Sequence, residues 1–60
     1  MTEVFVIEKM VVLGVWERLS NVVYKNEGTA IDQCESIIKY MQKTDKSFTA
    51  RVTKLLINKD

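Results

Sequence analysis

Apolar residues fill the first part of the chain without a clean alternation. From Glu3 to Met10 the sequence reads EVFVIEKM, which is rich in residues that favour strands. In a strand, Val4 and Val6 would share one face, and Phe5 and Ile7 would share the other. A strand that is apolar on both faces is covered on both sides or central in its sheet. We therefore expect a central strand over these residues.

A turn is expected where the first glycine follows this run. Gly14 can supply the positive φ that a tight turn often needs, so we place a hairpin reversal at Val12 to Val15. The second strand is then VWERL, from Val15 to Leu19, with Trp16 and Arg18 on one face. The polar residues that follow end this strand.

The central part of the chain has helical periodicity. Its apolar residues fall on an arc of about 120° at helical spacing. Asn26 is a suitable N-cap, while Glu27 and Lys43 place charges in the first and last turns as the helix dipole favours. Gly28 weakens the first turn, so a start at Thr29 is the alternative. The apolar positions are Ala30, Ile31, Cys34, Ile37, Ile38 and Met41.

A second alternating segment follows a polar turn. In FTARVTKLLI, the residues Phe48, Ala50 and Val52 alternate with polar ones, which predicts a third strand with one apolar and one polar face. The predicted order of elements is therefore strand, strand, helix, strand. It indicates an α+β fold of ββαβ type, with a three-stranded antiparallel sheet and one amphipathic helix on one face.

The predicted topology leaves one face of the sheet without a second layer. If the crossover is right-handed and the first strand is central, the strand order is 2-1-3 with antiparallel neighbours. The helix then covers one face, and no element remains for the other. That open face would carry either Phe5 or Val4, together with Trp16, Thr49 and Arg51.

Length and composition limit the means of stabilisation. Sixty residues form a single domain, 1–60, which buries only about 60% of the surface of its unfolded chain. With one cysteine and no histidine, neither an internal disulfide nor a Cys/His zinc site can form within the chain, and we expect no cofactor. The remaining means of support are a homodimer or another partner.

The same features indicate a location and argue against catalysis. A lone thiol and an N-terminus without a signal-peptide pattern favour the cytoplasm, and no uncharged run is long enough to cross a membrane. Without histidine the commonest general base is missing. Cys34 lies on the apolar arc of the predicted helix, so we expect a packed and inert thiol. We therefore predict that the protein is not an enzyme.

The hairpin is the first candidate binding surface. Its turn region is apolar where turns are normally polar, and Trp16 beside Arg18 has the composition of an interface hot spot. Two other interpretations stay open: Trp16 can belong to the core, and the strand boundary can lie elsewhere. The predicted partner-binding residues are Met10, Val11, Val12, Leu13, Trp16 and Arg18.

The basic second half of the chain is the alternative surface. Residues 1–35 carry three basic and six acidic side chains, whereas residues 36–60 carry six basic and two acidic ones. A basic open sheet face would suit nucleic acid, although ordinary solvated lysines would give the same pattern. The candidate nucleic-acid-binding residues are Lys43, Lys46, Arg51 and Lys54.

The order of these elements also resembles a class of proteins. The segments FVIE, VWERLSNVVYKNEGTAIDQC and FTARVTKLL together cover most of the chain and resemble short bacteriophage-encoded accessory proteins. The resemblance implies an inhibitor of a host enzyme or defence system, acting in the host cytoplasm. Our leading hypothesis is a protein-binding inhibitor or adaptor from a phage or mobile element, which engages a host protein through the apolar hairpin surface or an exposed strand edge.

Overall fold

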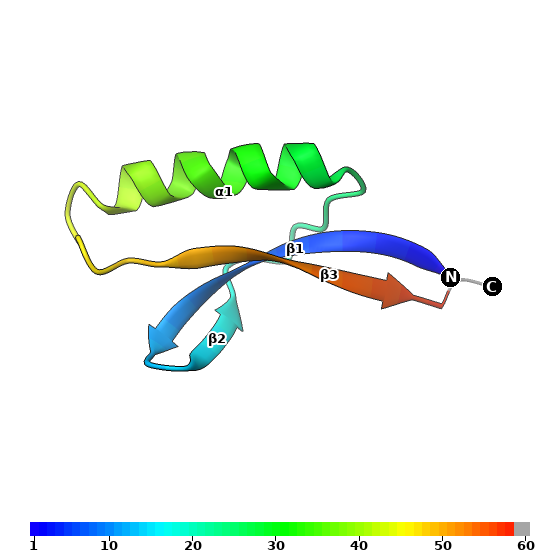
Figure 1. Cartoon of the computed structure of the whole chain (residues 1–60), viewed down its shortest axis with the longest axis horizontal. Coiled ribbons are helices and arrows are strands. Elements are labelled where there is room, and N and C mark those ends of the chain that lie inside the picture. Colours follow the sequence, from blue (N-terminus) through cyan, green and yellow to red (C-terminus); the bar gives the residue numbers. More distant parts are fainter. Residues whose placement is uncertain (59–60) are drawn as a thin grey trace.

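The computed structural model, which describes residues 1–58, contains the expected order of elements (Figure 1). Two strands are followed by a helix and a third strand, and the strands form one antiparallel sheet. The predicted ββαβ fold of α+β class is confirmed. The elements are β1 (Thr2–Val12), β2 (Val15–Arg18), α1 (Glu27–Met41) and β3 (Ala50–Ile57).

The strand order β2-β1-β3 places β1 in the centre of the sheet, as its two apolar faces predict. β1 pairs with β3 without a register shift from Thr2 opposite Ile57 to Lys9 opposite Ala50. Its pairing with β2 is shorter and has an irregularity between Met10 and Val12. The long side of the sheet is therefore regular, and the hairpin side carries a local distortion.

The reversal between β1 and β2 lies at the predicted glycine. Gly14 has a φ of 80°, a left-handed conformation that a residue with a side chain rarely adopts. The strand boundaries differ from those predicted, since β1 extends to Val12 and β2 ends at Arg18. β3 begins two residues later than predicted because the amide of Phe48 donates to the carbonyl of Asp45 in the preceding turn.

The helix begins at its predicted cap. The side chain of Asn26 accepts a hydrogen bond from the amide of Thr29 at 3.1 Å, so α1 starts at Glu27 and not at the alternative position. The predicted C-terminal end was wrong, because the helix ends at Met41. Lys43 therefore lies outside it, and Lys39 supplies the positive charge of the last turn.

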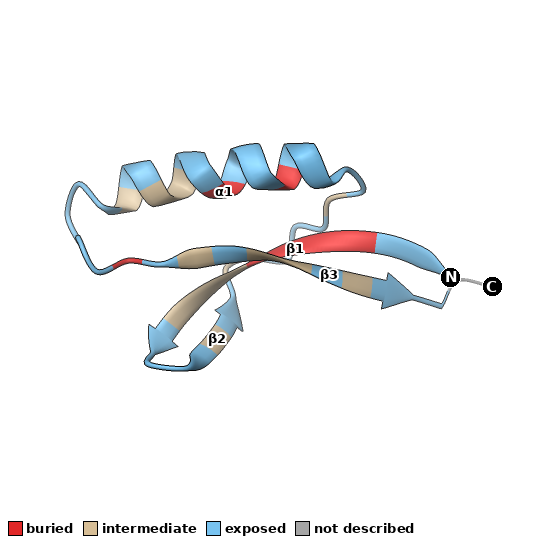
Figure 2. Ribbon diagram, in the orientation of Figure 1, coloured by how far each residue is buried: buried red, intermediate tan, exposed pale blue. Residues whose placement is uncertain are grey.

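The core lies between α1 and the sheet (Figure 2). On the helix, Ala30 and Cys34 are buried, and Ile37, Ile38 and Met41 are half-buried. Phe48, just before β3, is also buried. One helical prediction was wrong: Ile31 keeps 42% of its surface exposed because it lies at the margin of the contact with the sheet.

The opposite face of β1 is also covered over part of its length. Val4 and Val6 are buried, although the sequence predicts no second layer on their side. The segment that joins β2 to α1 follows the edge of β1 here, where the backbones of Phe5 and Tyr24 exchange hydrogen bonds of 2.7 and 2.8 Å. Connecting residues thus give some of the cover that no regular element supplies.

The ladder decides which of the two predicted residues shares a face with Arg51. Opposed residues in an antiparallel ladder point to the same side, and side chains alternate along a strand. Because Glu8 is opposite Arg51, the even-numbered residues of β1, Val4 among them, lie on the face of Arg51. Phe5 lies on the other face.

Candidate functional site

The hairpin formed by the end of β1 and by β2 projects from the side of the sheet away from α1 (Figure 1). We call residues Met10–Trp16 the hairpin arm. Among the regular elements of residues 1–58, the backbone of β2 lies next to that of β1 alone. The arm is therefore held at its base and has no layer of structure packed on it.

The arm presents apolar side chains to solvent. Leu13, at the tip, is 93% exposed, and Val12 is 61% exposed. Val11 and Val15 are also exposed, whereas Met10 and Trp16 at the base are half-buried. A run of neighbouring exposed aliphatic side chains is characteristic of interaction sites. Where no partner covers it, such a run lowers the solubility of a protein.

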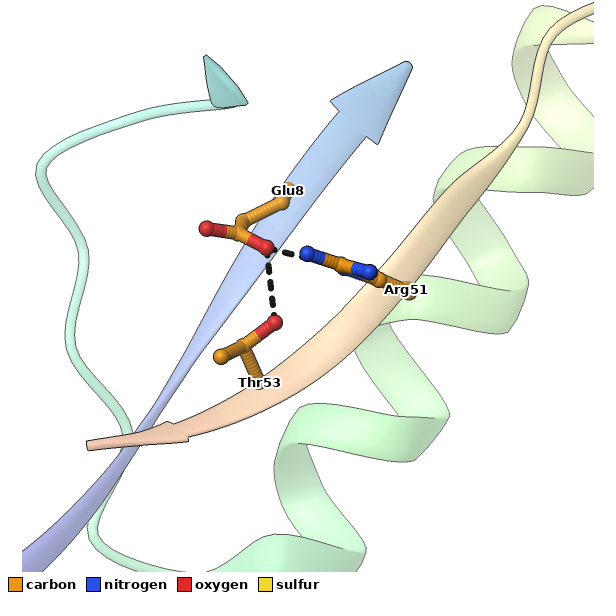
Figure 3. Close-up of polar contacts among 3 residues, drawn as sticks. All are labelled: Glu8, Arg51 and Thr53. Carbon is orange, nitrogen blue, oxygen red and sulfur yellow. Dashed lines mark hydrogen bonds and ion pairs between the residues drawn. The ribbon is translucent and has the colours of Figure 1, made fainter. Parts of the chain in front are cut away.

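A polar cluster lies at the base of the arm, on the face of the sheet turned away from α1 (Figure 3). The Nε of Arg51 donates to Oε1 of Glu8 at 2.9 Å, and the hydroxyl of Thr53 donates to the same oxygen at 2.7 Å. The hydrogen bond from Thr53 is the larger cause, and that from Arg51 the next, of a pKa of the Glu8 carboxyl below its ordinary value. Glu8 is thus an ionised acceptor shared by two residues of β3.

Trp16 joins this cluster from β2. The guanidinium carbon of Arg51 lies 4.1 Å from the centroid of the Trp16 ring, within the range of a cation–π contact. One side chain of β3 therefore contacts both strands of the hairpin, through Glu8 of β1 and Trp16 of β2. Arg18, paired with Glu8 across the hairpin, is exposed. Trp16 is half-buried under Arg51 and does not belong to the core beneath α1.

Two members of this cluster did not emerge from the sequence as site residues. Glu8 and Thr53 are 45 positions apart, and only the pairing of β1 with β3 brings them together. A weak signal was present in Glu8, a charged residue that interrupts an otherwise apolar strand. Its partners depend on register, which the sequence pattern alone does not specify.

The structure does not gather the four candidate nucleic-acid-binding residues on one surface. Lys43 and Lys46 lie in the turn between α1 and β3. Arg51 is already bonded to Glu8, on the face away from α1. Lys54 has the opposite parity in β3, and its Nζ lies 3.2 Å from Oε2 of Glu3.

The face of the sheet away from α1 also carries an apolar groove. It has a volume of about 400 Å³ and lies where the first residues of β1 meet the end of β3. The change of apolar face along β3 is the sequence signal for it: Val52 faces α1, whereas Leu55 and Ile57 face away. The groove is lined by Thr2, Val4, Val23, Lys25 and Ile57.

The thiol is placed as the helical pattern predicts. Cys34 is buried, and desolvation raises the pKa of its thiol, with a further contribution from the nearby charge of Glu35. Among residues 1–58, no three Cys, Asp or Glu side chains come together where they could hold a metal ion. In the same residues no helix has both the length and the apolar composition needed to cross a bilayer. The absence of catalysis stays a prediction.

Comparison with known proteins adds no assignment. The chain matches no family model, no curated protein and no solved structure. Function is therefore inferred from the geometry of the hairpin arm and the cluster at its base.

Proposed function

We propose that the protein is a non-catalytic protein-binding module whose docking element is the hairpin arm. The observation that supports this most directly is the exposure of Leu13 and Val12 at the tip of an arm whose strand β2 lies next to no regular element of residues 1–58 except β1. The partner expected is a protein with an apolar cleft that receives the tip, while Arg18 lies at the polar rim.

The energetics of the arm suit this role. Full burial of a Val or Leu side chain contributes about 1.5 to 3 kcal/mol, and the arm offers Val11, Val12, Leu13 and Val15. Association costs roughly 4 to 15 kcal/mol in lost freedom. Burial of the aliphatic side chains therefore offsets much of the free-energy cost of association. The contact of Arg51 with Trp16 holds the arm in place before binding, which reduces the loss of conformational freedom that binding requires.

The nature of the target is suggested by the resemblance to phage accessory proteins. Under this proposal the partner is a host enzyme or defence protein in the bacterial cytoplasm, and the module acts as an inhibitor or adaptor. A small non-catalytic chain can inhibit a larger protein by inserting an apolar tip into a cleft of that protein.

The experiment compares affinity capture from a bacterial lysate by three forms of the chain. The wild type and a control, Val22→Ser, are expected to retain the same protein, because Val22 is exposed but lies outside the arm. The double variant Val12→Ser, Leu13→Ser is expected to lose it while keeping the wild-type circular dichroism. Equal capture by all three forms would show that the arm is not the docking element.

The nucleic-acid alternative receives less support from the arrangement of charges, because Arg51 and Lys54 are each paired with a carboxylate. The remaining candidates, Lys43 and Lys46, lie together in one turn. Titration with single- and double-stranded oligonucleotides over a salt series separates the two proposals. Affinity that falls with salt, and falls further in the variant Lys43→Ala, Lys46→Ala, would favour the alternative.

A further inference from the structure

The two edges of the sheet differ in how far they resist pairing with another strand. At one edge, β2 spans four residues and its ladder is irregular. At the other edge, β3 spans eight residues in a ladder free of register shifts, and it contains neither proline nor glycine. Short and bulged strands protect a sheet edge, whereas a long regular strand is a template for another strand. The edge of β3 is the unprotected one.

The directions of the backbone groups along β3 follow from one hydrogen bond. The amide of Met10 donates to the carbonyl of Thr49 at 3.0 Å, so Thr49 and every second residue after it bond to β1. The residues between them direct their N–H and C=O groups away from the sheet. These outward residues are Ala50, Val52, Lys54 and Leu56.

We propose that a second copy of this chain pairs with the β3 edge, antiparallel and about a two-fold axis through Thr53. The two three-stranded sheets then become one sheet of six strands. This inference concerns the edge opposite the hairpin arm, so it stands or falls separately from the proposed function.

The register follows from symmetry and from the outward residues. Opposed residues of an antiparallel pair point to the same face of the sheet. A two-fold axis perpendicular to the sheet must therefore lie midway between one residue of β3 and the same residue of the second copy, and we name the axis by that residue. An axis through Thr53 opposes Val52 with the partner's Lys54, and Ala50 with the partner's Leu56. All outward backbone groups are then bonded. An axis through Val52 leaves Leu56 without a partner, and one through Lys54 sets two ammonium groups opposite each other.

The charges on β3 allow this pairing. Its two cationic side chains are each matched by a carboxylate of their own chain, Arg51 by Glu8 at 2.9 Å and Lys54 by Glu3 at 3.2 Å. An edge lysine is a common guard against strand addition. Here the nearby carboxylate offsets its charge, and the register through Thr53 sets it against an aliphatic side chain.

The helices suit the same arrangement. Because α1 packs on both β1 and β3, and strands are spaced by about 4.8 Å, two copies would place their helix axes about 10 Å apart, the usual packing distance. The Nε2 of Gln42 donates to the carbonyl of Phe48 beside the β3 edge, so that side of α1 faces the second copy. At helical spacing Ile31 lies on the same side as Gln42.

Two exposed apolar side chains would be covered by this pairing. Ile31, 42% exposed, lies on the flank of α1 that would meet the helix of the second copy. Leu56, 59% exposed, would lie opposite the partner's Ala50 and below that helix. A chain of 60 residues has a thin core, so covering these groups also adds stability that one copy lacks.

The first test uses a matched pair of variants at one outward position. Lys54→Pro removes an edge N–H that does not bond to β1, whereas Lys54→Ala removes the same side chain and keeps the N–H. Sedimentation equilibrium of the full chain is expected to show concentration-dependent dimers for the wild type and Lys54→Ala, and monomers for Lys54→Pro with wild-type circular dichroism. A wild type that is monomeric at all concentrations, or dimers of a folded Lys54→Pro, would overturn the proposal.

The second test measures the register and does not depend on the proline variant folding. Residues on the two-fold axis face each other as a non-hydrogen-bonded pair, within the reach of a disulfide. Thr53→Cys is therefore expected to form a reducible covalent dimer on mild oxidation, and Thr49→Cys is not. The Val12→Ser, Leu13→Ser variant is expected to dimerise like the wild type. Cross-linking by Thr49→Cys alone, or loss of the dimer in the arm variant, would contradict the β3 interface.

Discussion

The guanidinium carbon of Arg51 lies 4.1 Å from the centre of the Trp16 ring, which ties the last strand of the chain to the hairpin. The same guanidinium donates to Glu8 on the central strand. Among the described residues, this side chain is thus in contact with both other strands of the sheet. It holds the base of the hairpin arm, whose strand β2 lies next to no regular element of residues 1–58 except β1.

We expect Arg51→Ala to lower the free energy of unfolding by about 0.7 to 2 kcal/mol, since an exposed cation–π contact contributes about 0.5 to 1 kcal/mol and an exposed ion pair about 0.2 to 1 kcal/mol. Arg51 is about half exposed, so the lower part of this range applies. Urea titration followed by Trp16 fluorescence measures the change. Lys54→Ala is the control, because its pair with Glu3 is more exposed; an equal loss in both would contradict a special role for Arg51.

The ion pair predicts a dependence of stability on pH. The pKa of Glu8 is lowered in the folded chain by the Thr53 hydroxyl and by Arg51, so folding is favoured where this carboxylate is ionised. That contribution is full above the ordinary pKa of glutamate and is lost as the pH falls through the lowered folded value. Urea midpoints measured from neutral to acidic pH should fall less steeply for Glu8→Gln than for the wild type. Parallel curves would show that Glu8 does not titrate differently on folding.

Gly14 carries the turn of the hairpin arm at a φ of 80°. An added Cβ would meet no atom within 4 Å, so the cost of Gly14→Ala is conformational and not a clash. We expect Gly14→Ala to lower the free energy of unfolding by about 1 kcal/mol. Gly14→Asn should lower it by less, because asparagine tolerates the left-handed region. Thermal unfolding of the two variants measures the difference, and an equal loss would point to a cause other than φ.

Cys34 should react slowly in the folded protein. Its thiol is buried and its pKa is raised, so little thiolate is present or accessible at neutral pH. A coloured thiol reagent is expected to label the native chain far more slowly than the chain in urea. Rapid labelling under native conditions would show that the helix opens readily or that the thiol is activated.

The local elements could be derived from the sequence because their causes are local. Helical spacing from Ala30 to Met41, an N-cap at Asn26 and a glycine at the turn each act within a few residues. The distribution of apolar residues over the faces of the helix and the strands predicted the α+β fold and the central position of β1, because apolar faces are buried. The exposure of the apolar hairpin turn followed for the same reason.

Tertiary structure alone decided which distant side chains meet. The contacts of Arg51 with Glu8 and Trp16 depend on the register of β3 against β1, and a shift of one residue would send each side chain to the other face. The basic composition of residues 36–60 suggested that Arg51 and Lys54 belong to one surface. The pairing of β3 with β1 places them on opposite faces of the sheet. Tertiary structure also placed Val23, of the segment that joins β2 to α1, beside the buried Val4, and no pattern of spacing encodes the path of that segment.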